Sequence, residues 1–228
     1  ATADTGAIQW GLAIDQTKYS FPTAHALIAI MSITGNIDIP GGMTIYRNPY
    51  DIDQVTMRDY DLLTEEQASK RIGLEKYPLL QFGIPLAHPD EMVNQMDSDL
   101  PYPIKAMWIQ TTNPIACMAS EPRRVYDQMM RLDFIAAADP FMTPTIAALA
   151  DVVLPVTFYP EADSLYSEQD YALGAIIKAV EPKGECKSDY EICLELGKRL
   201  SPEDWPWETA DDLLTWQIQP TTGLTFQE

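Results

Sequence analysis

The chain has 228 residues, of which 46% are hydrophobic and 21% charged, so it is long enough to bury a sizeable core in one large or two small domains. Fifteen Lys and Arg against 34 Asp and Glu residues give a net charge of −19, which opposes binding to nucleic acid and to anionic membranes. No apolar run reaches the roughly 20 residues that cross a bilayer, and the longest candidate, "TIAALADVVLPV", is interrupted by Asp151.

The N-terminal part predicts one strand followed by one helix. The chain begins "ATADTG", without Met or a signal-peptide pattern, which indicates a processed product or a piece of a longer polypeptide and leaves the compartment open. Residues 7–14 are rich in bulky side chains and predict a strand. Residues 20–35 predict a helix with Ser20 as its cap, Pro22 in its first turn and Gly35 at its end.

Residues 43–103 predict an irregular insertion. They contain many Pro, Asp, Met and Tyr residues with weak periodicity, and a structureless loop of this length is improbable inside a compact domain. One helix is predicted within this stretch, at residues 64–73. Thr64 and Gln67 have the spacing of a capping box, and Gly73 is the expected end of the helix.

The middle of the chain alternates between predicted strands and helices. Residues 104–110, 133–138 and 151–156 predict strands, and residues 121–132 and 143–150 predict helices. Short apolar strands that alternate with helices are typical of a parallel sheet. We therefore expect an α/β fold: a Rossmann-like, mainly parallel sheet that also includes the strand at 7–14, with helices on both faces and an irregular insertion.

The C-terminal part predicts two further helices. In residues 188–200, Ser188 and Glu191 have capping-box spacing, and residues 209–218 predict a short final helix. We expect residues 1–228 to form a single domain with an insertion at about 43–103 and a C-terminal extension at about 201–228.

Polar residues follow each predicted strand at the point where it ends. Asp15 and Gln16 follow the first strand, Thr111–Asn113 the second, and Ala138 and Asp139 the third. The carboxyl ends of parallel strands meet at one edge of a sheet, where nucleotides bind. The spacing of Asp139 is compatible with two interpretations and favours neither. The residue is either an acceptor for ribose hydroxyls or the first residue of the "DPFMTP" turn. No G-x-G-x-x-G or G-x-x-x-x-G-K-[ST] motif occurs, which disfavours an ordinary NAD or ATP site.

The cysteines and histidines do not predict a metal site. Cys117, Cys186 and Cys193 include no C-x-x-C pair, and His25 and His88 are isolated in the sequence. An iron–sulfur or zinc site cannot be built from these cysteines alone. We expect all five residues to be structural or at the surface.

Several motifs resemble a known family. In order along the chain they are "QWGLAIDQ", "ITGNIDIPGG", "WIQTTNPIA", "DFIAAADPFMTPTIAALADVVLPVTFYPE" and "KAVEPKGECKSDYEI". From about Ala7 to Leu200 the chain resembles the central part of the molybdopterin oxidoreductases of the dimethyl-sulfoxide-reductase family. The tail, "WPWETADDLLTWQIQPTTG", resembles acetylene-hydratase-like members.

The resemblance implies a cofactor and partners. In this family, two molybdopterin guanine dinucleotides hold a molybdenum or tungsten ion through their dithiolenes. This segment would be the domain, usually counted third, that binds one dinucleotide and helps line the active-site funnel. The metal ligand and the iron–sulfur motif of the family lie upstream of the matching region, so the resemblance assigns no catalytic or metal-binding residue here. The implied partners are the remaining domains of the same polypeptide and an electron-transfer subunit, and the isolated chain is expected to be inactive.

The resemblance also implies six cofactor-binding residues. Asn113, the pair Ala138 and Asp139, and Asp189 match positions at the nucleotide end, and Leu12 and Gln16 match positions that face the pterin. Guanine presents adjacent N–H donors that a carboxylate accepts, and an Asn side chain can both donate and accept. Apart from the resemblance, Asp189 is explained by stabilisation of a helix dipole, worth about 0.3–1 kcal/mol.

One segment departs from the family pattern. "EADSLYSEQD" has Ala162 and Asp170 near positions where many members have a basic residue, glycine or Asn, so no residue of 162–170 is included in the predicted site. Two alternatives to an oxidoreductase remain open. One is a hydratase of the same family, which adds water without net electron transfer, and the other is a stand-alone nucleotide-binding module.

Overall fold

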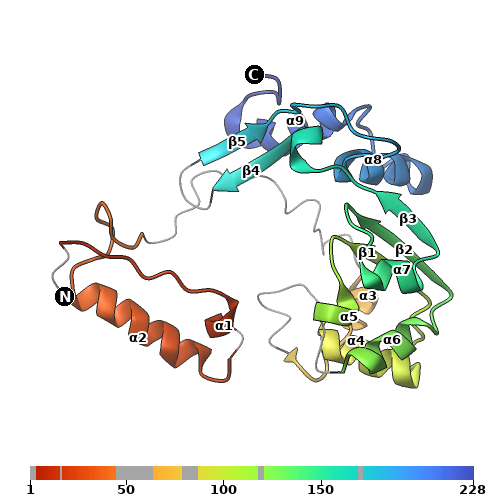
Figure 1. The fold of residues 1–228 in the computed structure, drawn as a ribbon, viewed down its shortest axis with the longest axis horizontal. Coiled ribbons are helices and arrows are strands. Elements are labelled where there is room, and N and C mark those ends of the chain that lie inside the picture. Colours follow the sequence, from red (N-terminus) through yellow and green to blue (C-terminus); the bar gives the residue numbers. More distant parts are fainter. Residues whose placement is uncertain (1–3, 16, 45–63, 79–86, 118–120, 169–171) are drawn as a thin grey trace. The chain divides into compact units, whose positions relative to one another are not determined.

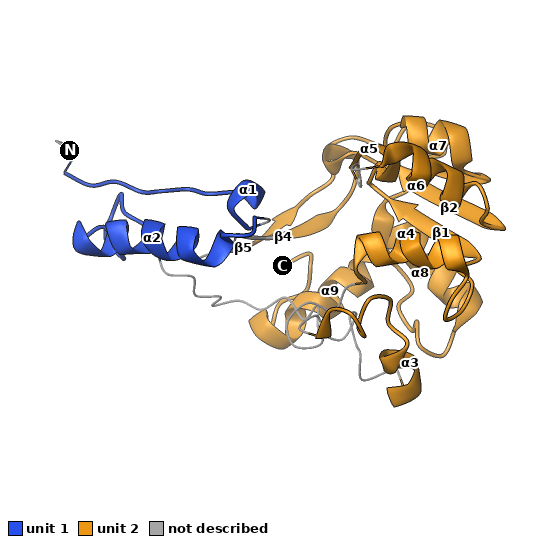
Figure 2. Cartoon of the chain, turned by 90° about the horizontal axis from the view of Figure 1, so that it is seen from below, with its two compact units in different colours: residues 1–50, 168–172 blue, residues 51–167, 173–228 orange. Residues whose placement is uncertain are grey.

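The computed structural model describes residues 4–15, 17–44, 64–78, 87–117, 121–168 and 172–228. The chain forms two compact units, coloured separately in Figure 2. Unit 1 comprises residues 1–50 and 168–172, and unit 2 comprises residues 51–167 and 173–228. The expected organisation as a single domain, with its insertion and its C-terminal extension, stays a prediction.

The predicted strand at residues 7–14 of unit 1 is wrong. Residues 7–11 have no regular secondary structure, and Leu12–Asp15 form the single helical turn α1. Bulky residues favour a strand only where a neighbouring strand pairs with the backbone, and no strand lies beside residues 7–11 in the described part of the chain. The short Leu-Ala-Ile run is equally compatible with a helix.

The predicted helix at 20–35 is confirmed as α2, Ser20–Ile33. Its N-cap is Tyr19, which makes no side-chain capping bond, so the predicted cap Ser20 is instead the first helical residue. Gly35 ends the helix with φ of 68°, a left-handed conformation that glycine adopts without strain. The bond from the Asn36 N–H to the Met31 carbonyl, 2.9 Å long, closes this end.

A parallel sheet of three strands forms the centre of unit 2 (Figure 1). The strands β1 (Ala106–Gln110), β2 (Phe134–Asp139) and β3 (Val152–Pro155) lie in the order β1-β2-β3. They confirm three of the four predicted strands and the α/β class. Gln110 pairs with Ala138, and Asp139 pairs with Pro155, so the carboxyl ends of the strands are aligned at one edge.

Three helices of unit 2 cover one face of this sheet. They are α4 (Pro89–Ser98), α6 (Pro122–Met129) and α7 (Pro144–Leu149). Their apolar side chains bury the alternate strand residues that point to this face. The shared core consists of Val93, Met96, Ile109, Val125, Met129, Ile135, Ala137, Ile146 and Leu149.

Helix α4 lies within the stretch predicted as an irregular insertion. It nevertheless buries Val93 and Met96 in the core of unit 2. Its apolar residues Met92, Val93 and Met96 have helical spacing, within a stretch whose periodicity is otherwise weak. This part of the stretch therefore belongs to the helical layer that packs on the sheet.

Helix α8 (Asp189–Leu200) faces the opposite side of the sheet, where Ile192 and Leu196 share a cavity with Trp108 and Leu154. Its predicted capping box of Ser188 and Glu191 is confirmed. Helix α9 (Ala210–Thr222) packs against α8 and is longer than predicted.

The remaining elements are α3 (Glu65–Ser69), α5 (Pro114–Cys117), the 3-10 turn Tyr159–Glu161 and the paired strands β4 (Ser164–Glu168) and β5 (Ala172–Ile176). None of the described helices has the length and apolarity needed to cross a membrane.

Candidate cofactor-binding site

The carboxyl edge of the sheet in unit 2 carries the polar groups that the sequence predicts. The Thr111 N–H donates to the Ala138 carbonyl over 2.9 Å and so extends the pairing of β1 with β2 by one residue. Thr111 then has φ of 48°, a left-handed conformation that a β-branched residue rarely adopts. This turn directs residues 112–115 past the end of the strand.

Asn113 is half-buried directly after this turn and is held at two points. Its carbonyl accepts from the N–H groups of Ala116 and Cys117, each over 2.9 Å, and thereby begins α5. Its side-chain Oδ1 accepts a hydrogen bond from the Thr145 hydroxyl. Thr145 is fully buried in α7, and its Oγ1 also accepts from the Ile115 N–H over 3.3 Å.

Ala138 and Asp139 form the carboxyl end of β2 and are 1% and 7% exposed. Ala138 has a small side chain and lies between Gln110 and Leu154 of the neighbouring strands. Asp139 Oδ1 accepts from the Phe141 N–H over 2.8 Å, so the turn reading of this residue is observed. Its other oxygen does not take part in this bond. The predicted contact of Asp139 with a nucleotide stays a prediction.

Asp189 is connected to the same edge through β1. It lies in the first turn of α8, and its Oδ1 accepts from Gln110 Nε2 over 2.5 Å. Gln110 Oε1 in turn accepts from the indole Nε1 of Trp108 over 2.9 Å. Asp189 therefore has a direct link to the sheet, beyond its place near the positive end of the helix dipole.

Gln110 and Thr145, which hold two of the predicted residues, are not among the residues predicted from the sequence. Gln110 is the last residue of a predicted strand, and its bond to Asp189 spans 79 positions. Thr145 lies in a predicted helix, between the apolar residues Pro144 and Ile146. The available signal in the sequence was a hydroxyl beside apolar residues in a predicted helix, because a hydroxyl that becomes buried needs a hydrogen-bond partner.

The two residues predicted to face the pterin lie in unit 1. Leu12 begins α1 and is exposed, whereas Gln16 lies outside the described residues. In the glycine-rich stretch of the same unit, a Cβ on Gly42 would lie 2.7 Å from the Asn36 carbonyl oxygen. This glycine is therefore required by contacts within its own loop.

Two titratable side chains beside Asp189 have pKa values above their ordinary ones. Burial raises the pKa of the Tyr190 hydroxyl, and this effect is larger than the lowering caused by its hydrogen bond with Ser164. Burial, and then the charge of Asp189, raise the pKa of the Cys193 thiol. Among the described residues, no three His, Cys, Asp or Glu side chains are grouped so that they could hold a metal ion.

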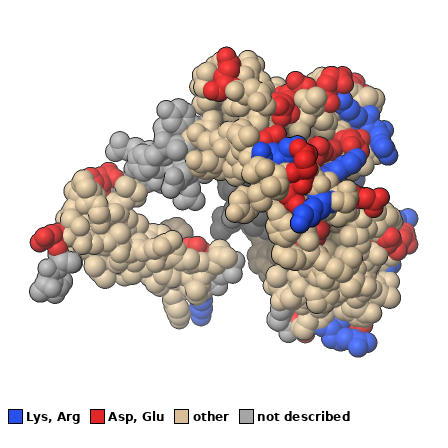
Figure 3. Space-filling model, turned by 45° about the horizontal axis from the view of Figure 1, so that its top comes forward, with Lys and Arg blue, Asp and Glu red and all other residues tan. Residues whose placement is uncertain are grey.

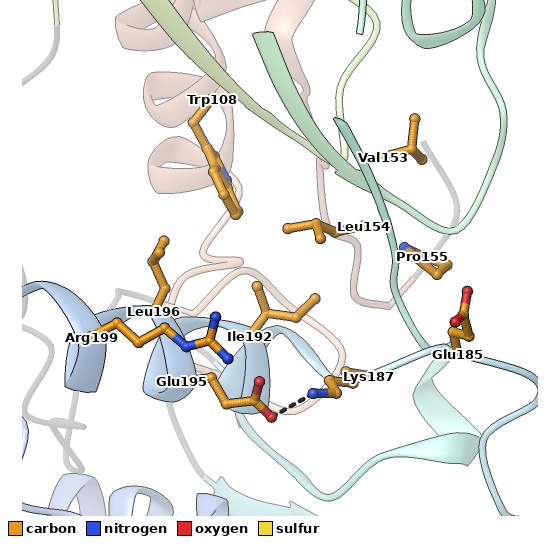
Figure 4. Close-up of a pocket in the computed structure, with 10 residues that line it drawn as sticks. All are labelled: Trp108, Val153, Leu154, Pro155, Glu185, Lys187, Ile192, Glu195, Leu196 and Arg199. Carbon is orange, nitrogen blue, oxygen red and sulfur yellow. Dashed lines mark hydrogen bonds and ion pairs between the residues drawn. The ribbon is translucent and has the colours of Figure 1, made fainter. Parts of the chain in front are cut away.

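A cavity of about 360 Å³ lies between the sheet and α8. Figure 4 shows Trp108, Leu154, Ile192 and Leu196 around it, with the ion pair of Lys187 and Glu195, 2.5 Å apart, beside them. None of the four predicted residues of unit 2, Asn113, Ala138, Asp139 and Asp189, lines this cavity. Basic side chains in unit 2 lie among acidic ones on the face shown in Figure 3. The predicted residues of unit 2 instead lie at the carboxyl ends of the strands.

A parallel sheet with polar groups at its carboxyl edge defines a class of α/β proteins that bind nucleotide-like ligands. Comparison with known proteins specifies the family, because residues 2–199 match molybdopterin oxidoreductase. The chain belongs to the molybdopterin oxidoreductase family. Membership implies a molybdopterin cofactor that carries molybdenum or tungsten.

Individual relatives agree with this assignment. The chain is 30% identical to dopamine dehydroxylase of Eggerthella lenta over 230 residues, which cover 96% of the chain and 22% of that protein. It is 27% identical to acetylene hydratase of Syntrophotalea acetylenica, over all of the chain and 34% of that enzyme. The solved structure of acetylene hydratase from Pelobacter acetylenicus matches with a TM-score of 0.81 and 25% identity, over 97% of the chain and 33% of that structure. The chain thus spans about a fifth to a third of the length of these relatives.

Proposed function

We propose that this chain is the part of a molybdenum or tungsten oxidoreductase that binds one of two molybdopterin guanine dinucleotides and helps line the active-site funnel. The observation that carries the proposal is the set of polar groups at the carboxyl edge of the sheet in unit 2. Asn113, Asp139 and Asp189 each have one side-chain oxygen held by a hydrogen bond within the chain. Their orientation is therefore set before a ligand binds.

The chemistry of these side chains fits the nucleotide end of the cofactor. The carboxylates of Asp139 and Asp189 can accept from the N–H donors of guanine or from ribose hydroxyls, and the Asn113 amide can donate to an oxygen. Ala138 precedes Asp139 at the end of β2 and has a small side chain. When bound, the metal and its dithiolenes would supply the redox chemistry, while this chain binds and orients the dinucleotide. Leu12 and Gln16 are the proposed contacts to the pterin.

The much greater length of the relatives supports partners outside this chain. We propose that the remaining domains of the same polypeptide complete the cofactor site and hold the metal ligand and an iron–sulfur cluster. For a redox enzyme, an electron-transfer subunit would then receive or deliver electrons. The same lengths favour a domain of a longer polypeptide over a stand-alone nucleotide-binding module.

A hydratase is the second candidate function. It is favoured by the structural match to acetylene hydratase, which extends over 97% of the chain. Water would then be added to the substrate without net electron transfer. Because both candidates use the same dinucleotide site, the following test applies to either.

The test measures cofactor content per folded complete polypeptide in variants of the edge residues. Asp139→Ala and Asp189→Ala should leave the fold intact and weaken cofactor retention by about five- to a hundredfold. The reason is that an unpaired donor of a buried guanine costs about 1–3 kcal/mol. Released pterin and guanine nucleotide give the content, and circular dichroism checks the fold.

Asp151→Ala is a matched control for loss of a structural hydrogen bond. The Asp151 carboxylate accepts from the Ile135 N–H over 2.8 Å, just as Asp139 accepts from the Phe141 N–H. However, Asp151 lies at the opposite end of the sheet, before β3. This variant should lose stability and keep its cofactor. Full cofactor content in well-folded Asp139→Ala and Asp189→Ala variants would remove both residues from the site.

A further inference from the structure

We infer that Thr145 is a positioning residue that turns the Asn113 amide so that its Nδ2 N–H group is presented to the ligand. The ligand atom at Asn113 is then an oxygen acceptor, such as a phosphate or ring-carbonyl oxygen, and not an N–H donor. This inference rests on the proposed function and specifies which chemical group of the dinucleotide one residue recognises.

The hydrogen bonds of Thr145 determine the orientation of the amide. The Ile115 N–H is a backbone donor, so Thr145 Oγ1 must be the acceptor in that contact. The hydroxyl has one hydrogen of its own, and Thr145 is 0% exposed, so this hydrogen needs an acceptor within the protein. Asn113 Oδ1 lies within hydrogen-bond distance and is that acceptor. The opposite orientation of the amide would leave the buried hydroxyl hydrogen facing an N–H group.

With the Asn113 amide in this orientation, Asn113 supplies a hydrogen-bond donor to the ligand and the two Asp residues supply acceptors. Asn113 Oδ1 is engaged by Thr145, so Nδ2 is the group of this half-buried side chain that remains for a ligand. Asp139 and Asp189 can only accept when ionised. A neutral N–H donor suits a phosphate oxygen, whereas a carboxylate that faced the same phosphate would repel it.

Thr145→Val tests the positioning in the complete polypeptide, because it keeps the shape of the side chain and removes the hydroxyl. The Asn113 amide then loses its orienting bond, and cofactor loss during dialysis should become about five- to tenfold faster, as expected for one net hydrogen bond. Thr145→Ser keeps the hydroxyl and should retain the cofactor nearly as the unmodified protein does. Rescue by Ser but not by Val would not be expected of a residue that only fills space.

Thr143→Val is the matched control on the same helix. Thr143 Oγ1 caps α7 by accepting from the Ile146 N–H over 3.3 Å, and the structure gives it no bond to Asn113. Its loss should lower the thermal midpoint of the protein without faster cofactor release. Equal release from the Thr143→Val and Thr145→Val variants would overturn the positioning role.

A double variant tests whether Thr145 acts through Asn113. Asn113→Ala/Thr145→Val should release cofactor no faster than Asn113→Ala alone, since the residue that Thr145 orients is already absent. If Asn113→Ala weakens retention and well-folded Thr145→Val does not, the positioning inference is wrong and the proposed function stands. If Asn113→Ala itself retains full cofactor, the proposed contact of Asn113 is wrong.

Asn113→Asp tests the donor assignment without any change at Thr145. The carboxylate can still accept from the Thr145 hydroxyl, but it has no N–H to donate. Release should be at least as fast as from Asn113→Ala. Retention equal to that of the unmodified protein would overturn the assignment, whether or not Thr145→Val folds.

Discussion

Cys117 and Cys193 have the same functional group in different surroundings. Cys117 ends α5 and is exposed, whereas Cys193 is half-buried in α8. Burial raises the pKa of the Cys193 thiol, and the nearby charge of Asp189 raises it further. Because the thiolate is the reactive form, the surroundings should set the order in which these two thiols react.

We predict that iodoacetamide at mildly alkaline pH modifies Cys117 well before Cys193 in the folded chain. Because the folded-state pKa of Cys193 is raised, the folded protein favours the protonated thiol. The contribution of this thiol to folding stability is fully present below the unfolded-state pKa and is lost as the pH rises through the folded-state pKa. Its alkylation should therefore increase only at higher pH than that of an ordinary thiol. Peptide mapping by mass spectrometry follows both sites. Equal rates in the folded chain would contradict the prediction, and equal rates in urea are expected.

Asp189 illustrates what could be predicted at the level of single residues. The family resemblance predicts it as a cofactor contact, which stays a prediction, and its place in the first turn of a capped helix was predicted correctly. Its bond to Gln110 could not be predicted, because it joins positions 79 apart and depends on where α8 packs. The same is true of Thr145 and Asn113, which are 32 positions apart.

Three helices begin where short-range signals predict. Thr64, Thr143 and Ser188 accept hydrogen bonds from backbone N–H groups in the first turns of α3, α7 and α8. These signals are local, because the capping side chain and the backbone N–H that donates to it are three residues apart. Packing between helices is not local, and Gly197 provides an example. A Cβ at this position of α8 would lie 2.1 Å from the Trp205 ring.

We predict that Gly197→Ala destabilises the chain by about 1–3 kcal/mol, because the large Trp205 ring must move to accommodate the methyl group. The ring also contacts Trp207, with centroids 5.7 Å apart, which restricts its movement. Urea unfolding of the purified chain gives the free energy. In a Trp205→Leu background the sign should reverse, since Ala is better than Gly in a helix by about 1 kcal/mol. Destabilisation of similar size in both backgrounds would show that the contact is not responsible.

At the scale of the whole molecule, α2 carries an unusual amount of exposed apolar surface. Phe21 is 75% exposed and Ile33 is 84% exposed, and of the helix only Met31 is buried. A helix that is apolar all round normally lies inside a larger protein. This agrees with the proposed packing of the chain against the other domains of a longer polypeptide.

We predict that the purified 228-residue chain retains neither metal nor pterin. The proposed dinucleotide site would be completed by domains outside this chain, and the net charge of −19 opposes a ligand that carries a pyrophosphate. Elemental analysis and pterin fluorescence measure both components. Stoichiometric molybdenum or tungsten in the purified chain would contradict the prediction, and the complete polypeptide serves as the positive control.

Local patterns in the sequence predict the strands β1, β2 and β3 of the parallel sheet and the helices α2, α6, α7, α8 and α9. Apolar spacing and capping residues act within a few positions of one another. The tertiary structure was needed for three further features. Residues 7–11 have a strand-like composition without a partner strand, and α4 joins the core although it lies in a stretch predicted to be irregular. Gln110 and Thr145 hold Asp189 and Asn113 from distant positions. These features depend on contacts between segments far apart in the chain, because a strand needs another backbone beside it and a buried polar group needs a partner wherever the fold places one.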